Sequence, residues 1–217
     1  MSEIAYSIRR SERARRVRVS VDAERGVEVV LPRRARRRDA DAAVRELRPW
    51  IERRLHELER ARGELGAREG VVFYLGEPLA LVAEPGRQQV ARRGDRLLVP
   101  AGDHRPALER WFRRRARAEI APRLDDACAR TDDSYTSLSN RSQRTRWASC
   151  GASGAMSFNW RLLLAPAPVL DAVVWHEVCH LHVADHSPRF WAQLQRHCPD
   201  YREHQRWLRR YGAMLTL

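Results

Sequence analysis

The segment with the clearest chemical potential reads His-Glu-Val-Cys-His over residues 176–180, an H-E-x-x-H pattern. Residues four apart lie on one face of a helix, so His176 and His180 can reach the same metal ion. Imidazole suits zinc, and Glu177 would take a proton from a zinc-activated water. The spacing therefore predicts a zinc hydrolase. The alternative is a pair of hydrogen-bonded core histidines, which is costly inside an apolar helix.

A catalytic zinc usually has three protein ligands and one open position. The candidates for the third ligand are several carboxylates and the histidines His182, His186, His197 and His204. Ser187-Pro188 marks the start of a new helix, so the chain must turn over residues 184–187. That turn can bring His186 back towards the ion, whereas His182 is expected on the far side of the helix, in solvent.

The rest of the chain must form the elements that position these residues. The expected strands lie within residues 1–31, 71–100 and 134–164, and the expected helices cover about 39–62, 105–130 and most of the chain from 168 onward. These patterns predict an α+β fold and a single domain over residues 1–217. Residues 1–100 are expected to be mainly strands plus one helix, and residues 101–217 to form a zincin-like catalytic part.

The composition is that of a globular protein, with 43% hydrophobic and 32% charged residues among 217. The net charge of +13 raises nucleic acid as a partner. All 41 basic residues are arginine, however, which suggests the codon bias of a GC-rich genome. Arg33–Arg38 and Arg113–Arg115 are the candidate patches for nucleic acid.

No apolar run approaches the roughly 20 residues that span a bilayer, so no membrane association is expected. The first residues lack an apolar signal core, and the expected compartment is the cytoplasm. The four cysteines form no CxxC pair and are expected to be free thiols.

Four further motifs lie on either side of the H-E-x-x-H segment. They are Arg-Thr-Arg-Trp-Ala-Ser-Cys at 144–150, Phe-Asn-Trp-Arg-Leu at 158–162, Asp-His-Ser at 185–187 and Phe-Trp at 190–191. Together they resemble the YgjP-like metal-dependent hydrolase family, which is grouped with SprT-like and zincin-type metallopeptidases. The resemblance covers nearly the whole chain and implies zinc ligands at His176, His180 and His186, with Glu177 as base. Ala148 departs from the family pattern, where glycine is usual.

The motif at residues 144–150 has two interpretations. In the first, Arg144, Arg146, Trp147 and Ser149 lie beside the zinc and bind substrate together with Asn159, because arginine can hold a carboxylate or phosphate in a bidentate manner. In the second, Trp147 is a core aromatic and the arginine stems cover it. Tyr201 and His204 are further candidates for stabilising an oxyanion.

The leading functional hypothesis is a zinc metallopeptidase that cleaves amide bonds of a peptide or protein. One alternative is a pyrophosphatase acting on nucleoside triphosphates such as UTP, with Arg144, Arg146 and Arg161 on the phosphates. Another is a SprT-like protease that acts on nucleic-acid-associated proteins. A structural zinc fold without activity is the fourth, and Glu177 argues against it because a structural site has no use for a base.

Overall fold

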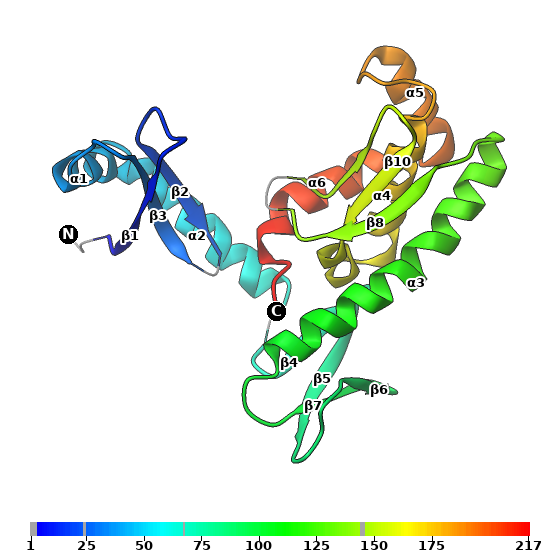
Figure 1. Cartoon of the computed structure of the whole chain (residues 1–217), viewed down its shortest axis with the longest axis horizontal. Helices are drawn as coiled ribbons and strands as arrows, with labels where there is room; N and C mark the ends of the chain where they lie inside the picture. The colour runs from blue at the N-terminus through cyan, green and yellow to red at the C-terminus, as the bar shows by residue number, and fades with distance from the viewer. Residues whose placement is uncertain (1–3, 24, 67, 144–145) are drawn as a thin grey trace. The chain divides into compact units, whose positions relative to one another are not determined.

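The structure is a computed structural model that describes residues 4–23, 25–66, 68–143 and 146–217. Its backbone divides into two compact units, Met1–Gly66 and Ala67–Leu217 (Figure 1). Both units combine small sheets with helices, so the α+β fold class is confirmed. The single domain over residues 1–217 stays a prediction.

The first unit pairs a three-stranded sheet with two helices. Strands β1 (Tyr6–Ser11), β2 (Arg18–Asp22) and β3 (Gly26–Pro32) have the order β1-β3-β2. The predicted hairpin is present as the antiparallel pair β2–β3, and β1 adds to it in parallel. Val29 and Leu31 alternate into a small core that Ile51 of the second helix completes.

The prediction of one helix over residues 39–62 was wrong. The described residues form two helices, α1 (Arg37–Glu46) and α2 (Arg48–Glu64), which meet at Leu47. Pro49 explains the break, because proline has no N–H to donate to the carbonyl of Arg45 and its ring crowds that carbonyl. Asp39 lies in the first turn of α1, where its carboxylate accepts the backbone N–H of Arg36 at 2.7 Å.

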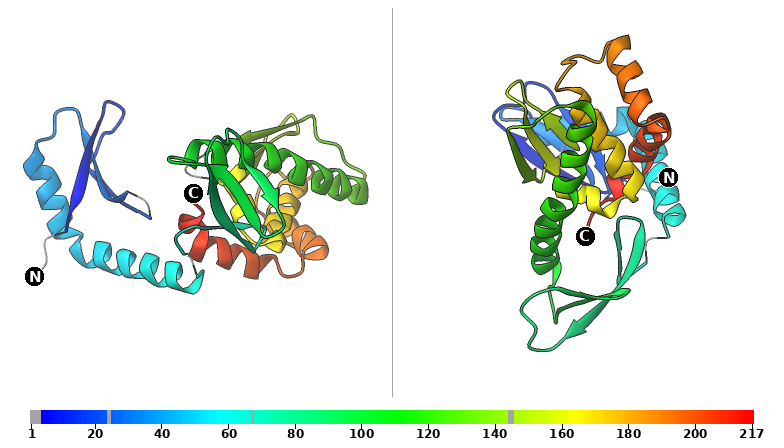
Figure 2. Two further views of the ribbon diagram at one scale, coloured as in Figure 1. Left: turned by 90° about the horizontal axis from the view of Figure 1, so that it is seen from below. Right: turned by 90° about the vertical axis from the view of Figure 1, so that its right-hand side faces the viewer.

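The second unit begins with a four-stranded sheet and a long helix. Strands β4 (Val71–Tyr74), β5 (Glu77–Glu84), β6 (Ala91–Arg93) and β7 (Arg96–Pro100) have the order β4-β5-β7-β6. Helix α3 (Arg105–Thr131) follows, as predicted to within a residue. The sheet lies near the N-terminal end of α3 in both figures of the ribbon (Figures 1 and 2).

A second sheet and the C-terminal helices lie along the remainder of α3. Strands β8 (Ser137–Arg141), β9 (Ala148–Cys150) and β10 (Ala155–Asn159) have the order β8-β10-β9, with β9 at an edge. They are followed by the 3₁₀ helix η1 (Trp160–Leu164), by helices α4 (Ala167–Cys179), α5 (Pro188–His197) and α6 (Tyr201–Tyr211), and by η2 (Gly212–Met214). The predicted turn at 151–154 joins β9 to β10.

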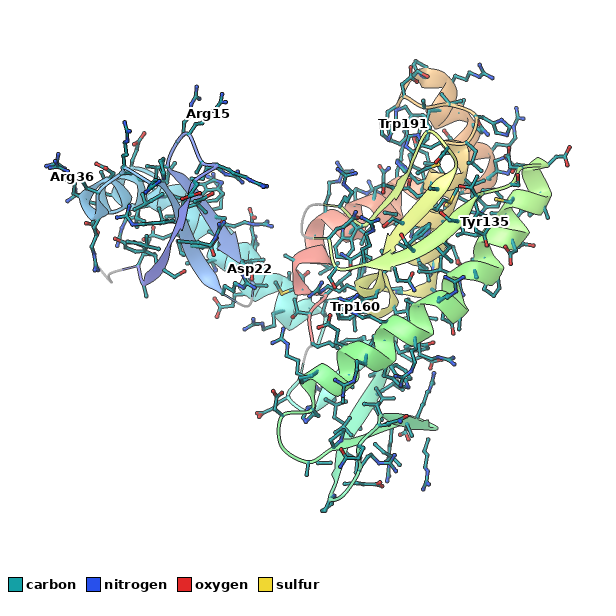
Figure 3. All side chains as sticks on the ribbon, in the orientation of Figure 1. Arg15, Asp22, Arg36, Tyr135, Trp160 and Trp191 are labelled. Atoms are coloured by element: carbon teal, nitrogen blue, oxygen red, sulfur yellow. The ribbon has the colours of Figure 1, made fainter. Side chains whose placement is uncertain are left out.

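Helix α4 lies in the core of this unit. Its buried residues are Val169, Leu170, Ala172, Val174, Trp175, Glu177, Val178 and Cys179. The neighbouring interior contains Phe112, Phe158 and Trp160, which are almost fully buried (Figure 3 labels Trp160). A helix that is apolar on most sides is stable only when surrounded, and α3, α5, α6 and β9 surround α4.

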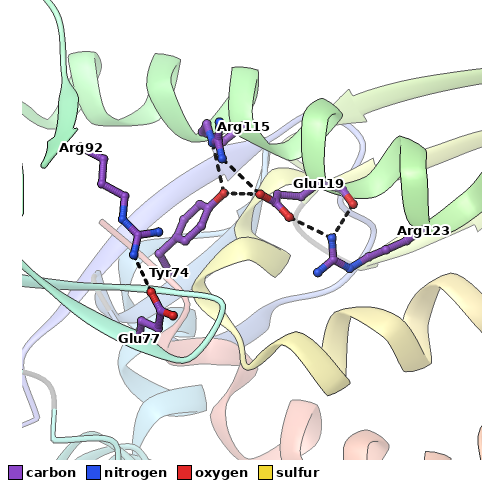
Figure 4. A network of polar contacts seen from close by, with 6 residues as sticks. All are labelled: Tyr74, Glu77, Arg92, Arg115, Glu119 and Arg123. Carbon is purple, nitrogen blue, oxygen red and sulfur yellow. Dashed lines mark hydrogen bonds and ion pairs between the residues drawn. The ribbon is translucent and has the colours of Figure 1, made fainter. Parts of the chain in front are cut away.

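A polar network joins α3 to β4 and to α4, and Figure 4 shows its members Tyr74, Glu119 and Arg123. The Tyr74 hydroxyl of β4 donates to Glu119 of α3 at 2.7 Å. Arg123 of α3 donates to the other Glu119 oxygen at 2.9 Å and to Asp171 of α4 at 2.8 Å. Partly exposed pairs of this kind contribute about 0–1 kcal/mol each. The Arg123–Asp171 pair joins α3 to α4 five residues before His176.

Candidate metal centre

The H-E-x-x-H residues lie at the C-terminal end of α4. His176 and Glu177 belong to its last turn, and His180 is the C-cap residue, with φ −70° and ψ −13°. This near-helical backbone keeps the i, i+4 relation of the two histidines. Their ring centroids are 4.9 Å apart.

The turn after α4 brings the third histidine to the other two, as the sequence predicts. Asp185 accepts the backbone N–H of Ser187 at 3.0 Å, and this closes the turn directly before α5. The Nε2 atoms of His186 and His176 are then 3.0 Å apart. One ligand atom each from His176, His180 and His186 lies within 4.8 Å of the others.

The hydrogen bonds of the triad fit a metal ion. The Nδ1 atom of His180 contacts the carbonyl oxygen of Val183 at 2.9 Å. A carbonyl can only accept, so Nδ1 carries a proton, and in the neutral ring Nε2 then has the lone pair that a metal ion requires. Metal-bound histidines in proteins usually show this arrangement. Three imidazole nitrogens within 4.8 Å of one another form a donor set that suits zinc and related divalent ions.

Phe190 of α5 is an aromatic support beneath all three imidazoles. Its ring centroid is 4.9 Å from that of His176, 4.5 Å from His180 and 4.8 Å from His186. Trp191, labelled in Figure 3, stacks on His186 at 5.4 Å. The two aromatic residues therefore fix the orientations of the ligand rings.

The electrostatics favour the neutral forms of His176 and His186. Burial, followed by the charges of His180 and His186, lowers the pKa of His176 from its ordinary value to about 4. Burial and His180 also lower the pKa of His186, although Asp185 acts in the opposite direction. Neutral imidazoles are the form that binds a metal.

Glu177 is buried beside the triad, with 5% of its surface exposed. Burial raises the pKa of its carboxyl group to about 7, while a backbone hydrogen bond from Cys150 and the charge of Arg146 lower it. The backbone of edge strand β9 thus holds the Glu177 carboxyl group. A carboxylate with a pKa near neutrality is suited to accept and return a proton.

A cavity of about 220 Å³, here called the apolar cavity, adjoins these residues. It is lined by Trp147, Ala148, Ala172, Val173, His176, Glu177, Leu194, Tyr201, His204, Gln205 and Leu208. The walls come from α4, α5, α6 and β9, with Trp147 directly before β9. Leu194 and Leu208 could not be recognised as cavity residues from the sequence, because their spacing is that of ordinary helix packing.

The residues predicted to bind substrate lie in different environments. Trp147 lines the apolar cavity, and Arg146 is exposed near Glu177. Ser149 is half-buried in β9, opposite Ser157. Asn159 is 2% exposed; it donates to Gln143 O at 2.8 Å and accepts Arg161 N–H at 3.2 Å. Arg144 lies outside the described residues.

The other candidate ligands are accounted for elsewhere. The Nε2 atom of His182 contacts Asp133 at 2.7 Å, so this side chain, although largely exposed, has a partner that the sequence did not indicate. His197 stacks on Trp175, with ring centroids 4.6 Å apart. Tyr201 and His204 both line the apolar cavity, and Tyr201 also stacks on Trp191 at 5.5 Å.

Comparison with known protein families assigns the chain. The family described as YgjP-like, metallopeptidase domain, matches residues 15–211, which includes the triad and the cavity. The chain belongs to the YgjP-like family. Membership gives the chain a metallopeptidase domain, and the family together with the His triad indicates a bound metal ion and a protein substrate.

No curated protein and no solved structure shows a significant match to this YgjP-like chain. Among its described residues, no helix is both long and apolar enough to cross a membrane. The four cysteines of the YgjP-like chain are free thiols, as predicted.

Proposed function

We propose that the protein is a zinc-dependent peptidase in which His176, His180 and His186 hold the ion and Glu177 is the general base. The observation that carries this proposal is the position of a buried carboxyl group next to three imidazoles whose candidate ligand atoms lie within 4.8 Å of one another. A structural metal site would need only the imidazoles. A buried carboxyl group beside them adds the capacity for proton transfer.

When bound, zinc supplies Lewis acidity that activates a water and polarises the carbonyl of the cleaved amide. The Glu177 carboxylate accepts a proton from the water and returns it to the leaving nitrogen. The backbone N–H of Cys150 orients the carboxylate during both transfers. Phe190 and Trp191 keep the imidazoles in place.

A peptide suits the site better than a nucleoside triphosphate. Of the arginines considered for phosphate binding, Arg161 lies over the Trp160 ring at 4.7 Å, and only the charge of Arg146 reaches Glu177 among the described residues. Nucleotide-phosphate sites usually gather several cations or backbone N–H groups around the phosphates.

One of the two arginine patches is partly neutralised within the protein. Arg113 donates to Glu109 at 2.7 Å, and Arg115 contacts Glu119 at 3.3 Å. These pairs reduce the charge available for phosphate contacts at 113–115. The patch at 33–38 belongs to the first unit, where Arg33 has a distant partner in Glu12 at 3.8 Å.

The test measures metal content and proteolysis together. Wild-type protein and a Glu177→Gln variant are purified, analysed for zinc and assayed on unfolded casein and on UTP. We expect one zinc per chain in both proteins, cleavage of casein by the wild type, and a loss of about 10²–10⁴-fold in the variant.

Each other outcome has a defined meaning. Absence of zinc from both proteins would overturn the metal site, and the triad would then be a group of core histidines. Turnover of UTP without cleavage of casein would replace the peptidase with the pyrophosphatase. Equal activity of the variant would remove Glu177 from the mechanism.

A further inference from the structure

The apolar cavity differs from the rest of the chain in its charge. The chain contains 41 arginines among 217 residues, yet none of the described residues that line this cavity is an arginine. Its apolar walls are formed by Trp147, Ala148, Ala172, Val173, Leu194 and Leu208. Such a lining disfavours a charged occupant, because the charge would lose its hydration without a matching partner.

The cavity is continuous with the candidate catalytic residues. His176 and Glu177 form part of its lining and also belong to the metal centre. A chain bound with its cleavable bond at the triad therefore brings one of the adjoining side chains to the cavity. Sites of this kind select substrates by the shape and polarity of that side chain.

We propose that the apolar cavity binds an uncharged apolar side chain of the substrate, at one of the two residues that flank the cleaved bond. This inference rests on the proposed peptidase function. An apolar cavity of about 150 Å³ can hold benzene, so about 220 Å³ accommodates the side chain of leucine, methionine or phenylalanine. The polar side chains His204 and Gln205 also line the cavity and add hydrogen-bonding capacity.

Gly212 sets the position of the Trp147 wall. A Cβ atom added at Gly212 would lie 2.8 Å from Cζ2 of Trp147, which is closer than real contacts allow. The Gly212 backbone is right-handed helical, with φ −56°, so only the indole requires a glycine there. Trp147 O accepts the Asn159 N–H at 2.7 Å, which fixes the backbone at the other end of the same residue.

The experiment compares substrates that differ in one residue. Cuts made in unfolded casein by the zinc-loaded protein are located by mass spectrometry. Peptides around one cut are then synthesised with Phe, Leu, Ala, Asp or Arg at each flanking position. We expect kcat/KM to be about 10-fold or more higher for Phe and Leu than for Ala at one position, and lowest for Asp and Arg.

Two variants connect the preference to the cavity. Leu208→Phe fills part of it and should reduce the Phe-to-Ala ratio towards one. Gly212→Ala displaces the indole and should change the same ratio. Leu81→Phe places the same substitution on a half-buried leucine of β5, outside the cavity, and should keep the wild-type ratio. Circular dichroism melts show whether each variant is folded.

The outcomes separate this inference from the proposed function. Cleavage without apolar preference, or a preference that both cavity variants leave unchanged, overturns the inference and keeps the peptidase. Absence of any cleavage by zinc-loaded protein overturns the peptidase. In that case saturation-transfer NMR decides on the cavity: it should detect N-acetyl-phenylalanine amide but not N-acetyl-aspartate amide, and the signal should weaken in Leu208→Phe. Equal signals from both amides would also overturn the inference.

Discussion

Helix α5 borders two cavities that differ in charge. Leu194 belongs to the apolar cavity, which contains His176 and Glu177. The other face of α5 borders a second cavity of about 470 Å³, here called the basic cavity. The basic cavity is lined by Arg130, Thr131, His182, Arg189, Ala192, Gln193, Arg196 and His197.

The difference follows the amphipathic pattern of α5. Phe190 and Leu194 are four residues apart and buried, whereas Arg189, Gln193 and Arg196 recur on the opposite face. Arginine is therefore abundant where the helix meets solvent and absent from the described lining next to the imidazoles. This contrast shows that the high arginine content is placed selectively, whatever its origin.

The largest effect is expected from removing one triad member. His180→Ala should lose the metal and lower peptidase activity by about 10³-fold or more, because the water would no longer be activated. His182→Ala, two residues further on and bordering the basic cavity, should retain one metal per chain. Metal analysis and kcat/KM on one casein-derived peptide measure both. Loss of metal in His182→Ala would contradict the assignment of His180 to the metal centre and of His182 to the basic cavity.

A positive charge placed in the apolar cavity should make the cavity favour an acidic side chain over an apolar one. Leu208→Arg is expected to raise the preference for Asp over Phe beside the cleaved bond by about 10- to 100-fold. Leu208→Gln is the control, because it adds polarity without charge. The peptide series measures both ratios, and an equal change in the two variants would mean that charge is not the cause.

The buried face of α5 should influence metal affinity more than its basic face. Phe190→Leu removes the ring that contacts all three imidazoles and should weaken zinc binding by about 10-fold. Leu194→Ile, on the same buried face but not a ring that stacks on the imidazoles, is the control. Competition with a zinc chelator measures affinity, and urea melts of the metal-free proteins measure stability. A loss of stability with unchanged affinity would make Phe190 a packing residue only.

The smallest effect concerns the basic cavity. Burial, followed by the charges of Arg130 and Arg196, lowers the pKa of His197. The other titratable or charged groups in the cavity are His182 and Arg189. A lowered histidine pKa means that the unfolded chain binds the proton more readily. The stability from this group is therefore present above the unfolded pKa and decreases as pH falls through the folded one.

Arg196→Gln removes one of these charges and should raise the pKa of His197. The loss of stability between about pH 7 and pH 5 should then become smaller. NMR titration of the His197 ring measures the first effect and urea melts across this range measure the second. Peptide selectivity should remain that of the wild type, and a changed selectivity would connect the basic cavity to the substrate.

The metal centre was predictable because its determinants are local. H-E-x-x-H fixes two imidazoles and a carboxyl group on one short helix, and Ser187-Pro188 predicts the turn that returns His186. The cavity was not predictable, because Leu208 and Trp147 meet only after the C-terminal helices pack on α4. The support from Phe190 was also missed, since a buried phenylalanine four residues before a leucine is typical of any amphipathic helix.

The fold was predictable where alternation or helical periodicity was long, as in β2, β3 and α3. The break between α1 and α2 was missed although Pro49 is visible in the sequence. The apolar spacing of Val44, Leu47 and Ile51 continues across the break, so the periodicity concealed it. Strand β1 pairs in parallel with β3, and this partnership has no turn signal.

The three candidate ligand histidines lie within a span of eleven residues, whereas the apolar cavity needs segments more than sixty residues apart. Short loops close at low entropic cost, so the triad can assemble early in folding, before the helices dock. A partly folded chain could then already bind zinc, and this affinity of the unfolded state would reduce the stabilisation that zinc gives the native one. Selective binding of an apolar side chain would instead require the complete second unit. A measured apolar preference would therefore indicate that this unit has its native packing.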